Sequence, residues 1–447
     1  MKADFNNSRS IIGNHMLADG MSPIIDLEKS HGSWLVDGRT GKEYLDLFSM
    51  YASMSIGYNH PYVLDNSDRI SSAAINKPAN SDIYSLEMAN FVDTVRRIAQ
   101  PDYLPYAFFI EGGALAVENA LKTAFDWKAR KNLDKGKKKP KNIVIHLKDC
   151  FHGRTGYTMS LTDSPDPRKV MYFPKFNWPR VSNPYLKFPL NKKNIQDVEL
   201  LEKKSISEIK NILANNPDDV ACLIIEPIQG EGGDNHFRSE YFKELKTLSL
   251  ENDFLLIYDE VQTGIGITGK MWAHQSFEPN KKNKLYCEKM EPDIISFGKK
   301  TQCCGIFAGR RLDEVEHHVF KESSRINSTF GGNLVDMVRF TIYLEVIENE
   351  NLVSLASKNG AYLLSCLNKM EEKYPNTISN SRGMGLFCAF DLPSSDKRDD
   401  LIRHMESEGA IILGCGHSSI RFRPHLNITE DEIDQAMFMM ESSINRL

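Results

Sequence analysis

The sequence has no long apolar run, no paired cysteines and no excess of charge of one sign. No segment approaches 18 uninterrupted apolar residues, and the N-terminal stretch MKADFNNSRSIIGNHM lacks the apolar core of a signal peptide. The 55 basic and 60 acidic residues leave a net charge of −5. This balance gives no electrostatic footprint for nucleic acid or an anionic membrane, so we expect small molecules as substrates.

The eight cysteines are scattered, without a C-x-x-C pair or the spacing of a metal site. Most lie in apolar surroundings, such as VACLIIEP and GLFCAF. They are typical of small buried thiols in a reducing compartment. We therefore expect no metal site and a cytoplasmic protein.

Short apolar runs alternate with helical patterns through the middle of the chain, which is typical of a mostly parallel sheet covered by helices. The predicted strands are AFFI (107–110), NIVIHL (142–147), VACLIIE (220–226), FLLIYD (254–259), DIISF (293–297) and GIFAG (305–309). The segment after the first strand repeats apolar residues at Val117, Leu121, Ala124 and Phe125, which predicts an amphipathic helix.

After about residue 335 the pattern changes to long helices, then two strand-like segments and a closing helix that begins with the capping pattern Thr429-x-x-Glu432. This pattern predicts a smaller α+β unit, which the first 70 residues are expected to join. The predicted domains are a large domain at 71–334 and a small domain formed by 1–70 and 335–447.

Charged side chains follow two of the predicted strands. Asp259-Glu260 ends one strand, and Lys299 comes directly after another; the carboxyl ends of parallel strands are where such sheets bind ligands. Taken alone, the Lys299-Lys300 pair fits a solvated loop, and the acidic pair fits a turn. The glycines of EGGALAVENALK open a helix whose N-terminus could bind phosphate. An amine, a carboxylate and a phosphate site together are what pyridoxal 5′-phosphate requires.

Distinctive stretches cover nearly the whole chain, among them EGGALAVENALK, FHGRTGYTMSLT, IIEPIQGEGGD, YDEVQTGIGITG, DIISFGKKTQCCGIFAGRR, INSTFGGNLVDMVR and IRFRP. In these stretches the sequence resembles the class III aminotransferases of fold type I, which use pyridoxal 5′-phosphate. The resemblance implies a large α/β domain with a mostly parallel seven-stranded sheet flanked by helices, and a smaller α+β domain built from both termini.

The resemblance also assigns the reactive groups. Lys299 is expected to bond the cofactor covalently and to act as general base and acid, while Lys300 points away. Asp259 is expected to pair with the pyridine nitrogen, and Gln262 with the phenolic oxygen. The other cofactor contacts that the resemblance implies are Gly113 and Ala114 at the phosphate, Phe151 stacked on the ring, His152 beside it, and Glu226 and Val261 nearby. Thr329 is expected to reach the phosphate from the neighbouring subunit, which implies a homodimer with shared active sites.

The activity that the resemblance implies is transfer of the ε-amino group of L-lysine to 2-oxoglutarate, giving L-glutamate and 2-aminoadipate 6-semialdehyde, which cyclises. Arg154 is expected to clamp the carboxylate of lysine and Arg421 that of glutamate. Alternation along a strand puts Arg421 and Arg423 on one face, so the choice of Arg421 rests on the resemblance. Glu231 is expected to pair with Arg421 while lysine is bound and to swing aside when glutamate or 2-oxoglutarate binds. The remaining substrate contacts implied are Asn327 and Ser328.

Two other functions remain open from the sequence. One is another ω-aminotransferase that acts on ornithine, 4-aminobutyrate or a related amine, and the other is a non-catalytic binding protein with this fold. The sequence also departs from the family in two places, an extended Lys-rich loop after residue 130 and a longer segment at 277–292. Both are predicted to be surface insertions.

Overall fold

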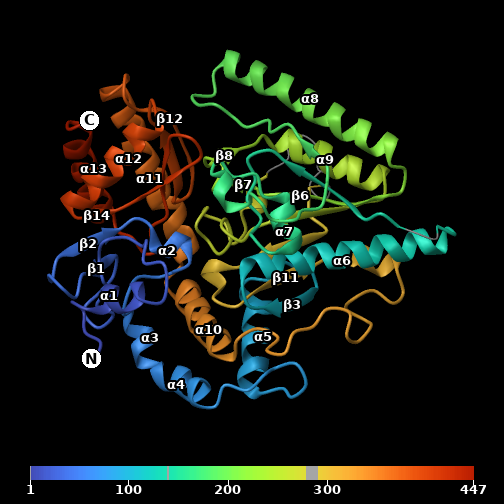
Figure 1. Ribbon diagram of the computed structural model, residues 1–447, viewed down its shortest axis with the longest axis horizontal. Coiled ribbons are helices and arrows are strands. Elements are labelled where there is room, and N and C mark those ends of the chain that lie inside the picture. Colours follow the sequence, from blue (N-terminus) through green and yellow to red (C-terminus); the bar gives the residue numbers. More distant parts are fainter. Residues whose placement is uncertain (1, 138–139, 278–289) are drawn as a thin grey trace.

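A seven-stranded sheet forms the centre of the protein in the computed structural model, which describes residues 2–137, 140–277 and 290–447 (Figure 1). The strand order is β3-β11-β10-β9-β6-β4-β5, and neighbouring strands are parallel except where β11 pairs with β3 and β10. The strands are β3 (Tyr106–Ile110), β4 (Ile143–Leu147), β5 (Arg180–Val181), β6 (Val220–Ile225), β9 (Leu255–Asp259), β10 (Ile294–Phe297) and β11 (Cys304–Ala308). The predicted α/β class and the six predicted strands are confirmed. β5 was not predicted, because two residues carry no period-2 pattern.

The inner strands of this sheet pack side chains on both faces, because successive residues point in opposite directions. In β6, Cys222 and Ile224 pack in one apolar cluster with α6 (Gly113–Asp134). Leu223 and Ile225 belong to the other cluster, which includes residues of α5 (Leu86–Ile98), α9 (Ser239–Glu251) and α10 (Leu334–Asn349). The sheet is therefore a buried middle layer, as its continuous apolar runs predicted.

The two ends of the chain lie together, and Figure 1 shows the blue N-terminal segments beside the red C-terminal ones. β2 (Glu43–Asp46) pairs antiparallel with β1 (Trp34–Val36) and parallel with β14 (Ala410–Ile411). A four-stranded antiparallel sheet follows the order β12 (Ser379–Met384), β13 (Phe387–Asp391), β16 (Ser419–Phe422), β15 (Leu413–Cys415). The pairing of β2 with β14 fits a unit built from both termini, while the boundaries at 70 and 335 stay predictions.

The capping pattern at Thr429 is confirmed: its side chain accepts from the backbone N–H of Glu432, which caps the Thr429 backbone in return, at the start of α13 (Glu430–Ile444). The remaining helices are α1 (Ser8–Gly13), α2 (Ser49–Ala52), α3 (Pro61–Asp65), α4 (Ser67–Ile75), α7 (Gly156–Leu161), α8 (Lys192–Asn215), α11 (Leu352–Lys373) and α12 (Ser395–Glu408). The short strands β7 (Ile228–Gln229) and β8 (Asn235–His236) form a hairpin, and the 3₁₀ turns are η1 (Pro167–Lys169), η2 (Ala273–Ser276), η4 (Lys299–Thr301) and η5 (Arg310–Glu314).

Six cysteines are buried as predicted, while Cys366 is partly exposed and Cys287 lies outside the described residues. Most of the predicted insertion at 277–292, and residues 138–139 of the Lys-rich loop, also lie outside them. Over the described ranges, no helix is long and apolar enough to cross a membrane.

Candidate active site

A cavity of about 450 Å³ lies at the carboxyl end of the central sheet, where the parallel strands β4, β6, β9 and β10 all end. The predicted site residues that line it are Gly113, Ala114, Phe151, His152, Arg154, Glu226, Glu231, Asp259, Val261, Gln262, Lys299 and Arg421. Three further lining residues, not predicted from the sequence, are Tyr51, Gly153 and Lys169. Side chains from segments more than 300 residues apart thus meet in one cavity.

The first turn of α6 forms part of the cavity wall. Its N-cap, Gly112, has φ +89° and no side-chain cap, a conformation that glycine adopts at little cost. A Cβ on Gly113 would lie 2.8 Å from Cγ1 of Val261, so a glycine is needed for the helix to approach this closely. Free N–H groups and the helix dipole attract phosphate. The geometry fits the predicted phosphate contacts at Gly113 and Ala114.

Lys299 follows β10 after a single residue, and its side chain reaches the cavity. Its φ of +54° is unusual for a residue with a Cβ and costs about 1 kcal/mol. Burial and, to a smaller extent, the positive charge of Arg421 lower the pKa of Lys299 to about 8, although Glu231 opposes the shift. The neutral amine, which is the form that attacks a carbonyl group, is therefore accessible near neutral pH.

Lys300 is fully buried and turns away from the cavity, as expected. Its Nζ donates to the backbone oxygens of Gln262, at 2.8 Å, and Ala52, at 3.3 Å. Ala52 ends α2, in which Tyr51 has φ +60°, and Tyr51 lines the cavity. Lys300 thus connects the left-handed turn that presents Tyr51 to the segment after β9. No sequence pattern indicated this contact, because the turn and Lys300 are 248 residues apart.

Asp259 ends β9 with both carboxylate oxygens engaged. Oδ1 accepts from the hydroxyl of Ser296 and the backbone N–H of Val261, both at 3.1 Å, while Oδ2 lies 2.8 Å from Nδ1 of His152. Ser296 is the register partner of Asp259 on β10. The buried Nε2 of His152 has no hydrogen-bond partner within the described part of the chain. A donor at Nδ1 of His152 would hold the Asp259 carboxylate in this orientation.

Glu226 follows β6 and joins two loops of the site. Its Oε1 accepts from the backbone N–H of Phe151 at 2.9 Å, and its Oε2 accepts from that of Gly230 at 3.1 Å. Burial raises the pKa of Glu226 well above its usual value, and the charge of Asp259 adds to the effect. Glu226 therefore fixes the backbone of Phe151, whose ring faces the cavity, and that of the loop carrying Glu231.

The structure distinguishes Arg421 from Arg423, which the sequence pattern could not. β16 ends at Phe422, so Arg423 lies just beyond it, where it pairs with both oxygens of Asp234, at 2.9 and 2.5 Å. The Nε of Arg423 donates to Oε1 of Gln262 at 2.9 Å, which leaves the Gln262 amide group to donate into the cavity. Arg421 lines the cavity, and among the described residues its buried Nε has no hydrogen-bond partner. Arg421 therefore keeps an N–H group available to donate to a ligand in the cavity.

Glu231 contacts Arg421 as the sequence comparison implied, with 3.1 Å between Oε2 and Nη2. Its Oε1 lies 2.5 Å from Nζ of Lys169, a residue that nothing in the sequence singled out. Burial would raise the pKa of Glu231, but Arg421 and Lys169 together lower it below its usual value. Glu231 is thus a carboxylate held between two cations.

The other predicted substrate residues are more exposed. Arg154 is exposed and lines the cavity. Asn327, Ser328 and Thr329 do not line it; Asn327 and Thr329 are exposed on the surface of the chain. The contact of Thr329 with the cofactor of a neighbouring subunit stays a prediction.

The arrangement of a strand-end lysine, a strand-end carboxylate and a helix N-terminus around one cavity is that of a pyridoxal-phosphate enzyme. Residues 16–444 match the family model described as aminotransferase class III, and the chain belongs to this family. It is 46% identical to the L-lysine-epsilon aminotransferase of Mycobacterium tuberculosis over 438 residues, covering 97% of this chain and 94% of that one.

A relative with the same name from Amycolatopsis lactamdurans is 43% identical over 445 residues, covering 99% and 96% of the two chains. The solved lysine aminotransferase from M. tuberculosis, in its internal aldimine form, has a TM-score of 0.94 and 44% identity, covering 99% of this chain and all of that one. The protein is an aminotransferase of fold type I that uses pyridoxal 5′-phosphate, as predicted.

The residues of the cavity fit this cofactor. The uncapped first turn of α6 suits a phosphate, Asp259 suits a protonated pyridine nitrogen, and the amide of Gln262 suits a phenolic oxygen. The amine of Lys299, which makes no hydrogen bond with the described part of the chain, is free to bond the aldehyde. These assignments of individual residues remain predictions.

Proposed function

We propose that the enzyme transfers the ε-amino group of L-lysine to 2-oxoglutarate, giving 2-aminoadipate 6-semialdehyde, which cyclises, and L-glutamate. The observation that carries the proposal is the ion pair between Glu231 and Arg421 inside the cavity. An arginine held by a displaceable carboxylate suits an enzyme that alternates between a diacid and a substrate with no carboxylate beside its reacting carbon. The names of the relatives that cover nearly the whole chain support the same substrate.

The bound cofactor supplies an electron sink for the carbanion formed when a proton leaves the substrate carbon next to nitrogen. Lys299 takes this proton and returns it at the other carbon, and its lowered pKa of about 8 suits both directions. Asp259, whose carboxylate is fixed by His152 and Ser296, would pair with the protonated pyridine nitrogen of the bound cofactor. Phe151 covers one face of the cavity and helps exclude water.

Two substrates must place their reacting carbons at the same point although their carboxylates lie at different distances. L-Lysine reacts through its far end, so its α-carboxylate extends toward Arg154, while Glu231 neutralises Arg421. L-Glutamate reacts next to its α-carboxylate, which pairs with Arg421 after Glu231 leaves it. Without Glu231, a buried guanidinium beside the methylene chain of lysine would lack a partner, at a cost of several kcal/mol.

We also propose that the protein is a homodimer in which Thr329, Asn327 and Ser328 complete the site of the partner copy. The segment that carries them is joined to Asn80, whose backbone N–H donates to the oxygen of Phe330 at 3.1 Å. Large apolar side chains near this junction are exposed, namely Ile75, Ile83, Tyr84, Leu86 and Phe330. Such a patch is typical of an interface between subunits.

The seven cysteines in the described part of the chain are all free thiols, which supports the proposed cytoplasmic location.

The test is a substrate panel with the purified holoenzyme. L-Lysine, L-ornithine, 4-aminobutyrate and cadaverine are each offered with 2-oxoglutarate, and glutamate formation is measured with the cyclised product identified by mass. The proposal expects L-lysine to have the highest kcat/KM. A higher value for ornithine or 4-aminobutyrate would assign the enzyme to another ω-amine, and absence of any cofactor absorption or turnover would favour the non-catalytic alternative.

A further inference from the structure

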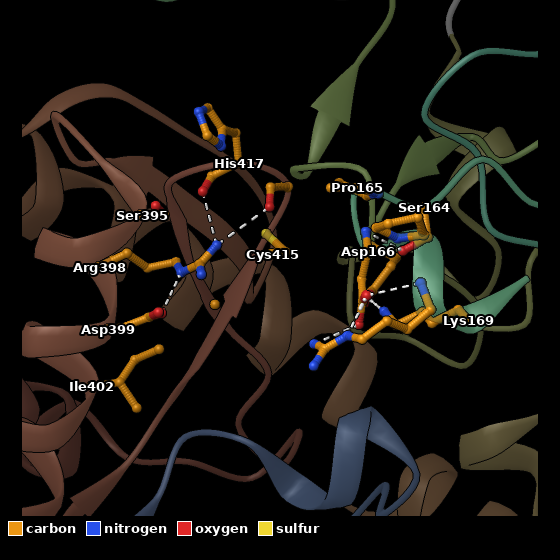
Figure 2. Close-up of a pocket in the computed structure, with 15 residues that line it drawn as sticks. Ser164, Pro165, Asp166, Lys169, Ser395, Arg398, Asp399, Ile402, Cys415 and His417 are labelled. Atoms are coloured by element: carbon orange, nitrogen blue, oxygen red, sulfur yellow. Dashed lines mark hydrogen bonds and ion pairs between the residues drawn. The ribbon is translucent and has the colours of Figure 1, made fainter. Parts of the chain in front are cut away.

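A second cavity of about 530 Å³ lies beside the cofactor cavity, and Lys169 and Glu231 line both. We refer to it as the outer cavity. One wall is the segment from Ser164 to Lys169, and the opposite wall carries Arg398, Cys415 and His417 (Figure 2). The pair formed by Lys169 and Glu231 therefore separates the cofactor cavity from the outer cavity.

The two oxygens of Glu231 have different partners. Arg421, on the inner side, is almost fully buried and rises from β16, whereas the Lys169 side chain is 27% exposed and rises from η1. Lys169 also lies over the ring of Phe151, with Nζ 5.7 Å from its centre. One cation thus belongs to the substrate site, and the other stands at its outer edge.

A diacid that pairs with Arg421 must take the place of the Glu231 carboxylate. A displaced carboxylate without a cation, in a partly desolvated position, is costly. Lys169 already holds the other oxygen of Glu231, on the side of the outer cavity. Rotation of Glu231 away from Arg421 therefore breaks one ion pair while the second can persist.

We propose that Lys169 is a positioning residue that retains Glu231 when a diacid substrate displaces it from Arg421. Lys169 lowers the cost of admitting the diacid, and so sets the balance between the lysine-binding and diacid-binding arrangements of the site. The inference rests on the proposed function, because it needs a diacid acceptor.

The other cations that line the outer cavity have partners of their own. Arg168 donates to both oxygens of Asp166, at 2.8 and 3.0 Å. Arg398 donates to Asp399 at 2.8 Å and to the backbone oxygen of His417 at 2.8 Å, as Figure 2 shows. Of the cations that line the outer cavity in the described part of the chain, Lys169 is the one that pairs with Glu231.

The test measures binding of glutarate, a five-carbon diacid that cannot react, to the holoenzyme by calorimetry. Lys169→Met is expected to raise the Kd by about 5-fold, the size of a partly exposed ion pair. Lys169→Arg keeps the charge and is expected to restore the Kd to near the parent value. Arg168→Gln removes the same charge one residue away, at a side chain that is 80% exposed, and is the matched control with an unchanged Kd.

The same substitution is then made in the Glu231→Gln background, where no carboxylate has to be retained. Lys169→Met is expected to leave the glutarate Kd unchanged there. In the parent background, Lys169→Met should raise the steady-state KM for 2-oxoglutarate by a larger factor than it slows the half-reaction with L-lysine. Lys169→Gln should reproduce this pattern. The inference is refuted by an unchanged Kd in the parent background. It is also refuted by weakening that persists without Glu231, since Lys169 would then contact the diacid itself.

Different results would contradict the proposed function and the proposed role of Lys169. If the proposed function is wrong, the unmodified enzyme does not convert L-lysine and 2-oxoglutarate. If only the role of Lys169 is wrong, the unmodified enzyme does so, and the glutarate Kd shows no dependence on Lys169 that requires Glu231.

Discussion

Arg421 and Arg423 stand two residues apart at the end of one strand, and the structure predicts opposite consequences when each is replaced. Arg421→Met removes the guanidinium that is proposed to bind the carboxylate next to the reacting carbon of glutamate. Arg423→Met removes the partner of Asp234, whose side chain is fully buried. Both variants replace arginine by methionine and so lose the same charge and the same side-chain volume, which makes each the control for the other.

The expected size of each effect follows from the carboxylate with which each arginine pairs. A bidentate carboxylate contact comprises two charge-assisted hydrogen bonds, worth about 1.5–3 kcal/mol each, so Arg421→Met should lower kcat/KM for L-glutamate by about 10²- to 10⁴-fold. Its effect on stability should be small, because Glu231 keeps Lys169 as a partner. Arg423→Met leaves a buried carboxylate without a cation, which should lower the free energy of unfolding by about 3–5 kcal/mol.

The assays are single-turnover absorption with L-glutamate and, separately, with L-lysine, together with thermal unfolding of each holoenzyme. Arg421→Met should lose the half-reaction with glutamate at a nearly unchanged unfolding temperature, and Arg423→Met should unfold at a distinctly lower one. If Arg423→Met instead lost glutamate specifically while keeping its stability, the assignment of Arg421 as the carboxylate-binding residue would be wrong.

Four further outcomes are expected. Borohydride reduction and peptide mapping should place the cofactor on Lys299, and Lys299→Ala should abolish turnover while still binding cofactor non-covalently; label on Lys300 would contradict the assignment. Arg154→Ala should reduce use of L-lysine about 10-fold or more but barely affect cadaverine, which has no carboxylate to pair; equal losses would mean that Arg154 acts on the fold or the cofactor. Glu231→Ala should slow the single turnover with L-lysine, leave that with L-glutamate intact or faster, and increase attack at the α-amine, whereas equal slowing of both half-reactions would rule out a gate on Arg421. Because burial lowers the pKa of Lys299 to about 8 from 10.5, its neutral form predominates above pH 8, so cofactor attachment to the apo-enzyme should accelerate up to about pH 8 and then level off; acceleration that continued toward 10.5 would contradict this.

The stability of the apo-enzyme should follow the same titration with a defined sign. Between about pH 8 and 10.5 the unfolded chain binds the proton of Lys299 and the folded chain does not. Stability therefore rises with pH over that interval, and the contribution of Lys299 disappears in Lys299→Ala. Denaturant unfolding of the parent apo-enzyme and of Lys299→Ala gives a profile of stability against pH for each, and the difference between the two profiles is the contribution of Lys299.

Local patterns predicted most of the scaffold. The continuous apolar runs before Glu226, Asp259 and Lys299 are sufficient for buried parallel strands, and the capping pattern at Thr429 fixes the start of the last helix. The same runs place three ionisable residues at the carboxyl ends of strands, where a parallel sheet brings them to one edge. What could not be predicted locally was β5, whose two residues depend on pairing with β4.

Sequence patterns alone were enough to predict which segments form the sheet and that Lys299 and Asp259 lie at its edge. The resemblance over nearly the whole chain indicated the family and its cofactor. The folded structure was needed to separate Arg421, which lines the cavity, from Arg423, which lies just beyond β16 and pairs with buried Asp234, because the sequence does not show what packs against each side chain. It also brought Lys169 to Glu231 and Lys300 to the turn that carries Tyr51. These two contacts join residues that are 62 and 248 positions apart in the chain. The residues concerned follow no periodic pattern in the sequence, so their burial and their partners become visible only in the folded chain.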